Sequence, residues 1–347
     1  MTPFGTMPDG TPVESITLSG GGTAVTIITL GATVQAVTVP DRQGRVADVV
    51  LGYDDLAGYL AGSHYFGATI GRYANRIGGA AFTLDGKTYR TSANSGLHTL
   101  HGGADGFDSK VWRITAVTQG PVASVTLRLV SPNGDQGFPG ALTVDTTFAV
   151  DGGGTLTQVI RATTDAPTVI NLTNHSYWNL AGGGSAMDHL LTVPAADYAP
   201  VDATLIPTGE FRPVAATPFD FRRATAIGKR VRDGRDAQLR YSRGYDHAWA
   251  VSRTRSAEPR LVARLSDPGS GRTLEVLSTE PGVQVYSANF LDGATVGKLG
   301  RIYRMGDAVS LEPQCFPDTP NKPGFGSARL APGELYDHHI AFRFTAE

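Results

Sequence analysis

The chain has 347 residues and a formal net charge of −2, with 30 Lys and Arg against 32 Asp and Glu. This balance gives no electrostatic footprint for nucleic acid or an anionic membrane. No apolar run approaches the roughly 20 residues of a membrane helix. Residues 1–5 lack the basic and apolar segments of a signal peptide. We therefore expect a soluble, cytoplasmic globular protein without nucleic-acid or membrane partners.

The expected elements are mostly short strands, in which apolar and polar residues alternate so that one face meets a core. In chain order we expect an alternating run over 25–39, a short helix over 54–61 and a hairpin over 82–89. Asp85-Gly86 at the tip of that hairpin accepts the positive φ of a tight turn. Further alternating runs cover 125–129, 142–150, 155–162, 261–266 and 273–278.

Many short strands with frequent turns predict an all-β fold, a large antiparallel β-sandwich with few short helices. The 43 glycines and 21 prolines fit such a turn-rich chain. Length alone suggests about two domains, but all-β folds often exceed 200 residues as one unit. Because no repeat or linker divides the chain, we expect a single domain over residues 1–347.

Six segments place polar residues among aromatics or glycines, where an ordinary strand would not. Amides, carboxylates and Arg match paired hydroxyl groups, and aromatic faces pack on the C–H side of a sugar ring. We therefore expect a site for an uncharged, polyhydroxylated ligand. The segments are 71–77, 100–103, 174–180, 245–247, 281–286 and 311–314.

Phosphate and metal sites are weakly supported. The glycine runs 20–22 and 182–184 do not form G-x-G-x-x-G after a strand, so we interpret them as loops. We expect the loop at 181–185 to lie near the sugar site. The adjacent pairs at 188–189 and 337–339 place neighbouring side chains on opposite faces of a strand, which does not suit one ion. Cys315 is the single cysteine, which excludes an internal disulfide and a multi-cysteine metal cluster.

Taken in order, these segments resemble the aldose 1-epimerase (galactose mutarotase) family from about residue 10 onward. The matching motifs are G-R-x-A-N-R-I, L-H-G-G, N-H-x-Y-W-N-L, P-G-V-Q and E-P-Q followed by P-D-x-P-N. The resemblance implies the sandwich fold of that family and interconversion of the α and β anomers of a free monosaccharide. It implies no cofactor and no metal. It also implies that His175 is the general acid and Glu312 the general base, and that the sugar is bound by Asn75, Arg76, His101, Tyr177, Asp246 and Gln284.

The chemistry of ring opening supports this acid and base. A proton must leave the C1 hydroxyl while another reaches the ring oxygen, and a carboxylate and an imidazolium suit these two tasks near neutral pH. We expect a neighbouring carboxylate to raise the pKa of His175. Nucleophiles, metals and redox groups are not required.

Each position also has a structural interpretation when taken alone. Arg72 is a nearer candidate than Arg76 for a surface ion pair. His98 competes with His101, but only His101 precedes Gly-Gly, which allows a close backbone approach to a ligand. Cys315 is expected to be a small buried hydrophobe.

Two other functions remain as alternatives. A non-catalytic carbohydrate-binding sandwich would not need both His175 and Glu312. A glycoside hydrolase would need two carboxylates across the scissile bond, for which Asp246 and Glu312 are available. The preferred aldose (galactose, glucose, xylose or arabinose) stays open, and we expect a monomer.

Overall fold

The computed structural model describes residues 1–62 and 64–347, and within these ranges the long strands form three antiparallel sheets. The nine-stranded sheet has the order β11 (Arg113–Thr118), β12 (Ala123–Ser131), β13 (Leu142–Val150), β14 (Leu156–Thr164), β30 (Tyr336–Ala346), β24 (Arg272–Ser278), β23 (Arg260–Ser266), β18 (Leu190–Thr192) and β21 (Thr225–Ala226). The five-stranded sheet has the order β1 (Thr2–Thr6), β2 (Pro12–Gly20), β3 (Thr23–Ile28), β4 (Thr33–Pro40) and β5 (Val46–Asp48). The six-stranded sheet has the order β17 (Tyr177–Trp178), β28 (Val309–Gln314), β25 (Gly282–Tyr286), β22 (Asp246–Ala250), β19 (Asp197–Ala199) and β20 (Arg212–Pro213).

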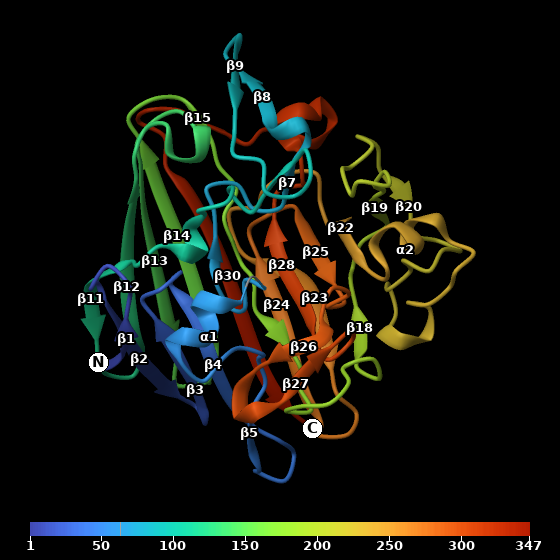
Figure 1. Ribbon diagram of the computed structural model, residues 1–347. Coiled ribbons are helices and arrows are strands. Elements are labelled where there is room, and N and C mark those ends of the chain that lie inside the picture. Colours follow the sequence, from blue (N-terminus) through green and yellow to red (C-terminus); the bar gives the residue numbers. More distant parts are fainter. Residues whose placement is uncertain (63) are drawn as a thin grey trace.

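The sheets pack in layers around a shared hydrophobic core. β2 and β3 lie against β12 and β13, and β25 lies against β23. Figure 1 shows β11 to β14 of the nine-stranded sheet at the left of the molecule, with β28, β25 and β22 of the six-stranded sheet to their right. The largest core cluster takes residues from all three sheets, for example Ile16, Val144, Trp249, Val283 and Phe342. The predicted antiparallel β-sandwich is confirmed.

Alternation along the long strands confirms the period-two prediction. In β13 the residues with even numbers, such as Val144 and Phe148, are buried, while their odd-numbered neighbours are half-buried. Such a strand buries one face and hydrates the other. The expected run over 25–39 is divided into β3 and β4, because Gly31 and Ala32 turn the chain with φ of 67° and 42°.

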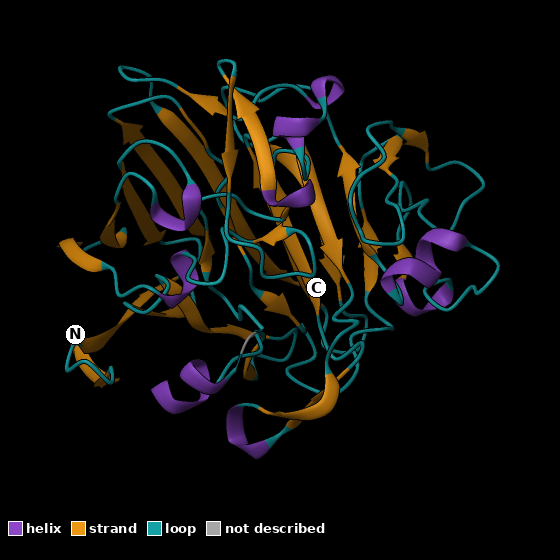
Figure 2. Ribbon diagram, turned by 45° about the horizontal axis from the view of Figure 1, so that its top comes forward, coloured by secondary structure: helices purple, strands orange, loops and turns teal. Residues whose placement is uncertain are grey.

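The helices are short, as expected. α1 (Leu56–Ala61) begins after Asp55, whose side chain accepts a hydrogen bond from the N–H of Gly58. α2 (Ala237–Ser242) and seven 3₁₀ turns complete the helical part of the described chain, and none of its helices is long and apolar enough to cross a membrane. Figure 2 shows these helical turns around the edges of the sheets. The 3₁₀ turns are Gly78–Ala80, Phe107–Ser109, Asp135–Gly137, Ile227–Lys229, Lys298–Gly300, Thr319–Asn321 and Pro323–Phe325.

Short antiparallel pairs form in the segments between the long strands. The predicted hairpin is present as β8 (Ala81–Leu84) and β9 (Lys87–Arg90), joined by Asp85 and Gly86 at φ of 49° and 81°. The other pairs are β6 (Thr69–Ile70) with β16 (Thr173–Asn174), β7 (Arg76–Ile77) with β10 (Thr99–Leu100), β15 (Thr168–Val169) with β29 (Arg329–Leu330), and β26 (Asp292–Val296) with β27 (Ile302–Arg304).

Candidate active site

One face of the six-stranded sheet carries a row of polar and aromatic side chains. Asp246 pairs with Tyr286 across β22 and β25, and Gln284 pairs with Glu312 across β25 and β28. Because side chains alternate along a strand, these residues share a face, while Trp249 and Val283 point into the core from the other. Every residue of β28 and β25 is buried. The strand register therefore places the carboxylates together.

The pairing of β7 with β10 brings Asn75, Arg76 and His101 to the same place. The N–H of His101 donates to the carbonyl of Asn75 over 3.0 Å, and the N–H of Asn75 donates to Nδ1 of His101 over 3.2 Å. Asn75 and His101 adopt left-handed φ of 63° and 53°. This mutual bond fixes the imidazole of His101 next to the Asn75 backbone.

The pairing of β16 with β6 positions His175. Its N–H donates to the carbonyl of Ala68 over 2.9 Å, and its carbonyl accepts from Gly67 over 3.0 Å. The imidazole stacks on Tyr177, with ring centroids 5.1 Å apart, and lies 5.9 Å from the ring of Tyr65. His101 meets it edge-on, with centroids 5.0 Å apart. Aromatic rings therefore enclose His175 on several sides.

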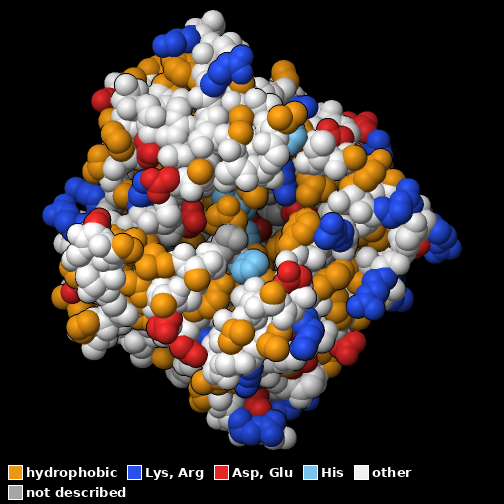
Figure 3. All heavy atoms as spheres, in the orientation of Figure 1, with side chains coloured by type: hydrophobic (Ala, Val, Ile, Leu, Met, Phe, Trp, Pro, Cys, Tyr) orange, Lys and Arg blue, Asp and Glu red, His pale blue; other side chains and the backbone are white. Residues whose placement is uncertain are grey.

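These side chains line a cleft of about 250 Å³. Figure 3 shows histidine and acidic atoms in a hollow near the middle of this face, beside apolar ones. All the predicted site residues except Gln284 line it; the lining also includes His64, Tyr65, Leu100, Tyr286 and Phe290. Tyr286 lies in the segment 281–286 that the sequence singled out, at a spacing of two from Gln284. No comparable pattern marks His64, Tyr65 or Phe290.

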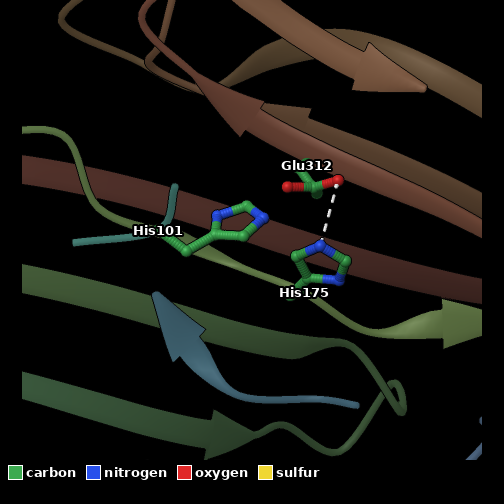
Figure 4. Close-up of side chains that lie close together, drawn as sticks. All are labelled: His101, His175 and Glu312. Atoms are coloured by element: carbon green, nitrogen blue, oxygen red, sulfur yellow. Dashed lines mark ion pairs between the residues drawn. The ribbon is translucent and has the colours of Figure 1, made fainter. Parts of the chain in front are cut away.

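His175 and Glu312 face each other in the cleft. Nε2 of His175 lies 3.6 Å from Oε1 of Glu312, and both side chains are almost fully buried (Figure 4). Among the residues that the structure describes, Oε2 of Glu312 and Nδ1 of His175 have no hydrogen-bond partner. Buried polar atoms are rarely left unpaired, so two such atoms on facing side chains distinguish this pair from groups that only hold the fold.

Burial sets the protonation of this pair. It raises the pKa of the Glu312 carboxyl well above its usual range. The negative charge of Asp246 raises this pKa further, and the positive charge of Arg76 lowers it. Burial also lowers the pKa of His175 to about 4. This corrects the expectation that a carboxylate would raise the pKa of His175. For His175, desolvation outweighs the opposing effect of its backbone hydrogen bond, so burial favours the neutral forms of both groups.

His101 presents a donor to the cleft. Because Nδ1 accepts the Asn75 N–H, the neutral imidazole carries its proton on Nε2. Burial, followed by the nearby His175 and Arg76, lowers the pKa of His101 well below its usual range, which keeps the ring neutral. The ligating atoms of His101, His175 and Glu312 lie within 4.8 Å of one another, a donor set that resembles a zinc or iron site. With its proton on Nε2, His101 suits a sugar oxygen better than a metal ion.

A chain of polar contacts extends from Arg76. Its Nη1 lies 3.4 Å from Oδ2 of Asp246, and Nε2 of Gln284 donates to Oδ1 of Asp246 over 2.6 Å. Gln284 lines a small adjoining cavity with Arg76 and Asp246, and its Oε1 is buried without a described partner. The structure thus places Gln284 behind Asp246. Direct sugar binding by Gln284 stays a prediction.

Several minor expectations need correction. Arg72 is buried rather than at the surface, and its guanidinium donates to the carbonyls of Pro139, Gly140 and Ser131. A Cβ on Gly102 would lie 2.0 Å from the carbonyl oxygen of Gly71, so this glycine is needed for backbone packing rather than for a ligand.

Two other expectations concern Cys315 and the glycine loop. Cys315 is buried as predicted, and burial raises the pKa of its thiol to about 12. The loop at 182–184 lines a separate groove beside β5 and β27, not the cleft. It therefore does not contact a sugar held between His175 and Glu312.

Comparisons with known proteins agree with the fold and the cleft. A family model described as aldose 1-epimerase matches residues 14–343. Galactose mutarotase of Bos taurus is 45% identical over 345 residues, covering 99% of this chain and 97% of the relative. Aldose 1-epimerase of Escherichia coli (strain K12) is 36% identical over 344 residues, covering 98% and 97%.

Solved structures extend the likeness to the whole fold. An aldose epimerase homologue from C. elegans superposes with a TM-score of 0.88 at 31% identity, covering 96% of this chain and 99% of that one. Galactose 1-epimerase from Lactobacillus acidophilus gives a TM-score of 0.87 at 27% identity, covering 98% and 97%. On the full-length match to the family model and to these relatives, the chain belongs to the aldose 1-epimerase family.

Proposed function

We propose that the protein is an aldose 1-epimerase, an isomerase that interconverts the α and β anomers of a free monosaccharide. The observation that carries this is the facing pair of His175 Nε2 and Glu312 Oε1, 3.6 Å apart at the buried end of a cleft lined by polar and aromatic groups. Full-length relatives named galactose mutarotase and aldose 1-epimerase support the same reaction.

In the proposed mechanism Glu312 and His175 act on two oxygens of one carbon. The pair holds one proton, which moves between the two facing groups; in the form with Glu312 ionised and His175 protonated, Glu312 takes the proton of the C1 hydroxyl while His175 delivers a proton to the ring oxygen, and the bond between C1 and the ring oxygen breaks. The open aldehyde turns about C1–C2 and presents its other face. Closure returns both protons with the two residues in exchanged roles, so no proton or electron is gained or lost.

Recognition is assigned to the groups around this pair. We propose that Arg76, Asp246 and Asn75 bind hydroxyl groups and that Nε2–H of His101 donates to a sugar oxygen. Tyr177 offers an aromatic face, which suits the C–H side of a pyranose. Gln284 holds the carboxylate of Asp246 in place from behind.

The finer assignments are also proposals. Galactose is the first substrate to test, because the relatives with highest identity given above carry it in their name. A single domain over 1–347 is supported by one core cluster that includes residues from Ile16 to Phe342. A monomer and a cytoplasmic location stay predictions from the sequence.

Polarimetry tests the function directly. Freshly dissolved α-galactose, α-glucose, α-xylose and arabinose should reach the same final rotation as without protein, but faster. An unchanged rate with tight sugar binding would identify a carbohydrate-binding protein instead. Free monosaccharide released from a disaccharide would identify a glycoside hydrolase, a reaction we do not expect because Arg76 and Gln284 already engage the carboxylate of Asp246.

A further inference from the structure

Three chain segments that supply the cleft meet at one buried side chain, Asn171. Its Nδ2 donates to the carbonyl of Ala74 over 3.0 Å, immediately before Asn75. Its Oδ1 accepts the N–H of Cys315 over 3.1 Å, three residues beyond Glu312. Asn171 itself lies four residues before His175. One side-chain amide therefore bonds the segments of Asn75, His175 and Glu312 to one another.

Main-chain bonds at the same residue make the junction tight. The N–H of Asn171 donates to the carbonyl of Arg72 over 3.1 Å, and its carbonyl accepts from Ala74 over 2.7 Å. Two residues later, Oγ1 of Thr173 donates to the carbonyl of Pro313 over 2.7 Å. The segment that leads to His175 is thus bonded at two points to the segment that contains Glu312.

Asn171 is fully buried and does not line the cleft. A buried amide is costly unless its hydrogen bonds are made, and an apolar side chain would satisfy packing at lower cost. Here Nδ2 and Oδ1 of the Asn171 side chain each form a hydrogen bond with a main-chain group, and the two main-chain groups belong to different segments. This pattern fits a group that fixes the relative placement of those segments.

We propose that Asn171 is a positioning residue for the epimerase reaction proposed above, and that its amide, aided by the Thr173 hydroxyl, sets the separation of His175 from Glu312. Proton transfer by two groups to oxygens of one carbon needs both groups within hydrogen-bond reach at once. A misplacement of about 1 Å can cost about 10²-fold in rate. Substrate binding depends less on this separation, because the sugar also contacts other groups.

The test compares Asn171→Ala with Asn179→Ala by polarimetry on α-galactose, with thermal unfolding measured on both. Asn179 is a matched control: it is buried, and its side chain bonds the main chain at Gly184, Asp307 and Ala181 over 2.7–3.0 Å. We expect similar losses of Tm. In Asn171→Ala kcat should fall by about 10–10²-fold with KM within about threefold, while Asn179→Ala keeps kcat within about twofold.

A second pair of variants, at Thr173, tests the proposal if Asn171→Ala does not fold. Thr173→Val removes one hydroxyl with little change in volume, and Thr173→Ser restores the donor. We expect kcat to fall by about 3–10-fold in Thr173→Val and to recover in Thr173→Ser. Equal kcat in Asn171→Ala and Asn179→Ala, or wild-type kcat in Thr173→Val, would overturn the positioning role while leaving the function intact. A wild-type protein that does not accelerate mutarotation would overturn both.

Discussion

The cleft contrasts with a larger groove elsewhere on the molecule. That groove, here called the β5–β27 groove, has a volume of about 760 Å³ against about 250 Å³ for the cleft. It lies beside β5, β26 and β27, which Figure 1 shows together near the lower end of the molecule. Its walls include Asp48, Lys298, Arg301 and Asp307. By size and charge alone it would be the better candidate for a site.

The two regions differ in how their polar groups are satisfied. In the groove, Nζ of Lys298 bonds Oδ2 of Asp48 over 2.7 Å, and Arg301 donates to the carbonyl of Gly182 over 2.6 Å. Oδ2 of Asp307 accepts the N–H of Arg304 over 2.7 Å. In the cleft, Glu312 Oε2 and His175 Nδ1 have no partner in the described chain.

The smaller cleft is the better candidate for chemistry, because an acid and a base face each other there and each has an atom without a partner in the described chain. In the groove these charged groups form short bonds to one another or to the main chain; in the cleft, Arg76 and Asp246 are 3.4 Å apart and both still line the open space. Burial also shifts the pKa values of the two facing groups in the cleft in opposite directions, upward for Glu312 and downward for His175.

The largest effect is expected from the facing pair. His175→Asn and Glu312→Gln each remove one proton-transfer partner, so kcat should fall by roughly 10²–10⁴-fold. Polarimetry with α-galactose measures the loss, and circular dichroism checks that the fold is retained. A variant that keeps more than about a tenth of wild-type kcat would remove its residue from the mechanism.

The next effect concerns the groups assigned to hydroxyl binding. Arg76→Ala and Asp246→Ala leave sugar hydroxyls unpaired in a partly desolvated cleft, which should cost about 1–3 kcal/mol in kcat/KM. Gln284→Ala should cost less, because Gln284 acts through Asp246. Wild-type kcat/KM in all three variants would place the sugar elsewhere.

The pH profile tests whether burial controls the pair. The pair must hold one proton in total, which one group gives while the other receives. Because the pKa of His175 is lowered to about 4, kcat/KM should fall below about pH 4 as the pair gains a second proton. Because the pKa of Glu312 is raised, the alkaline fall should come when the pair loses its only proton.

Variants of His175 and Glu312 show which residue causes each limb of the pH profile. In His175→Asn the residual rate depends on ionised Glu312 alone, so its acid limb should move up to the pH of the wild-type alkaline limb. In Glu312→Gln the residual rate needs the imidazolium and should decline above about pH 4. An acid limb that stays at its wild-type position in His175→Asn would show that Glu312 is not the base.

Sequence reasoning succeeded where one face of a strand meets water. The alternation in β12 and β13 was visible because polar residues occupy the hydrated face. β25 and β28 are buried on both faces, so their alternation was hidden and only motif resemblance pointed to Glu312. The depressed pKa of His175 was missed because it arises from burial, which neighbouring residues in sequence do not reveal.

Loops explain the remaining omissions. His64 and Tyr65 reach the cleft through a turn in which Tyr65 has a φ of 58°, and nothing in the local sequence marks them as partners of His101. Asn171 likewise resembles any strand residue until its contacts with Ala74 and Cys315 are seen. Such groups depend on chain crossings that sequence patterns do not specify.

The smallest effect on activity is expected from the β5–β27 groove. Lys298→Met removes the cation that bonds Asp48, while Oδ1 of Asp48 still accepts from the N–H groups of Val37 and Val50. Lys298 is buried and Asp48 is partly exposed, so breaking the pair should cost more than breaking a surface pair and less than breaking a fully buried one; unfolding free energy should fall by about 1–2 kcal/mol, measured in urea. The double variant Lys298→Met with Asp48→Asn should recover part of that loss, because no carboxylate is then left unpaired. In both, kcat/KM should stay within about twofold of wild type, since neither residue lines the cleft. A fall in kcat/KM beyond tenfold without unfolding would show that the Lys298–Asp48 pair of the groove is coupled to catalysis. The distinction between a structural groove and a catalytic cleft would then be wrong.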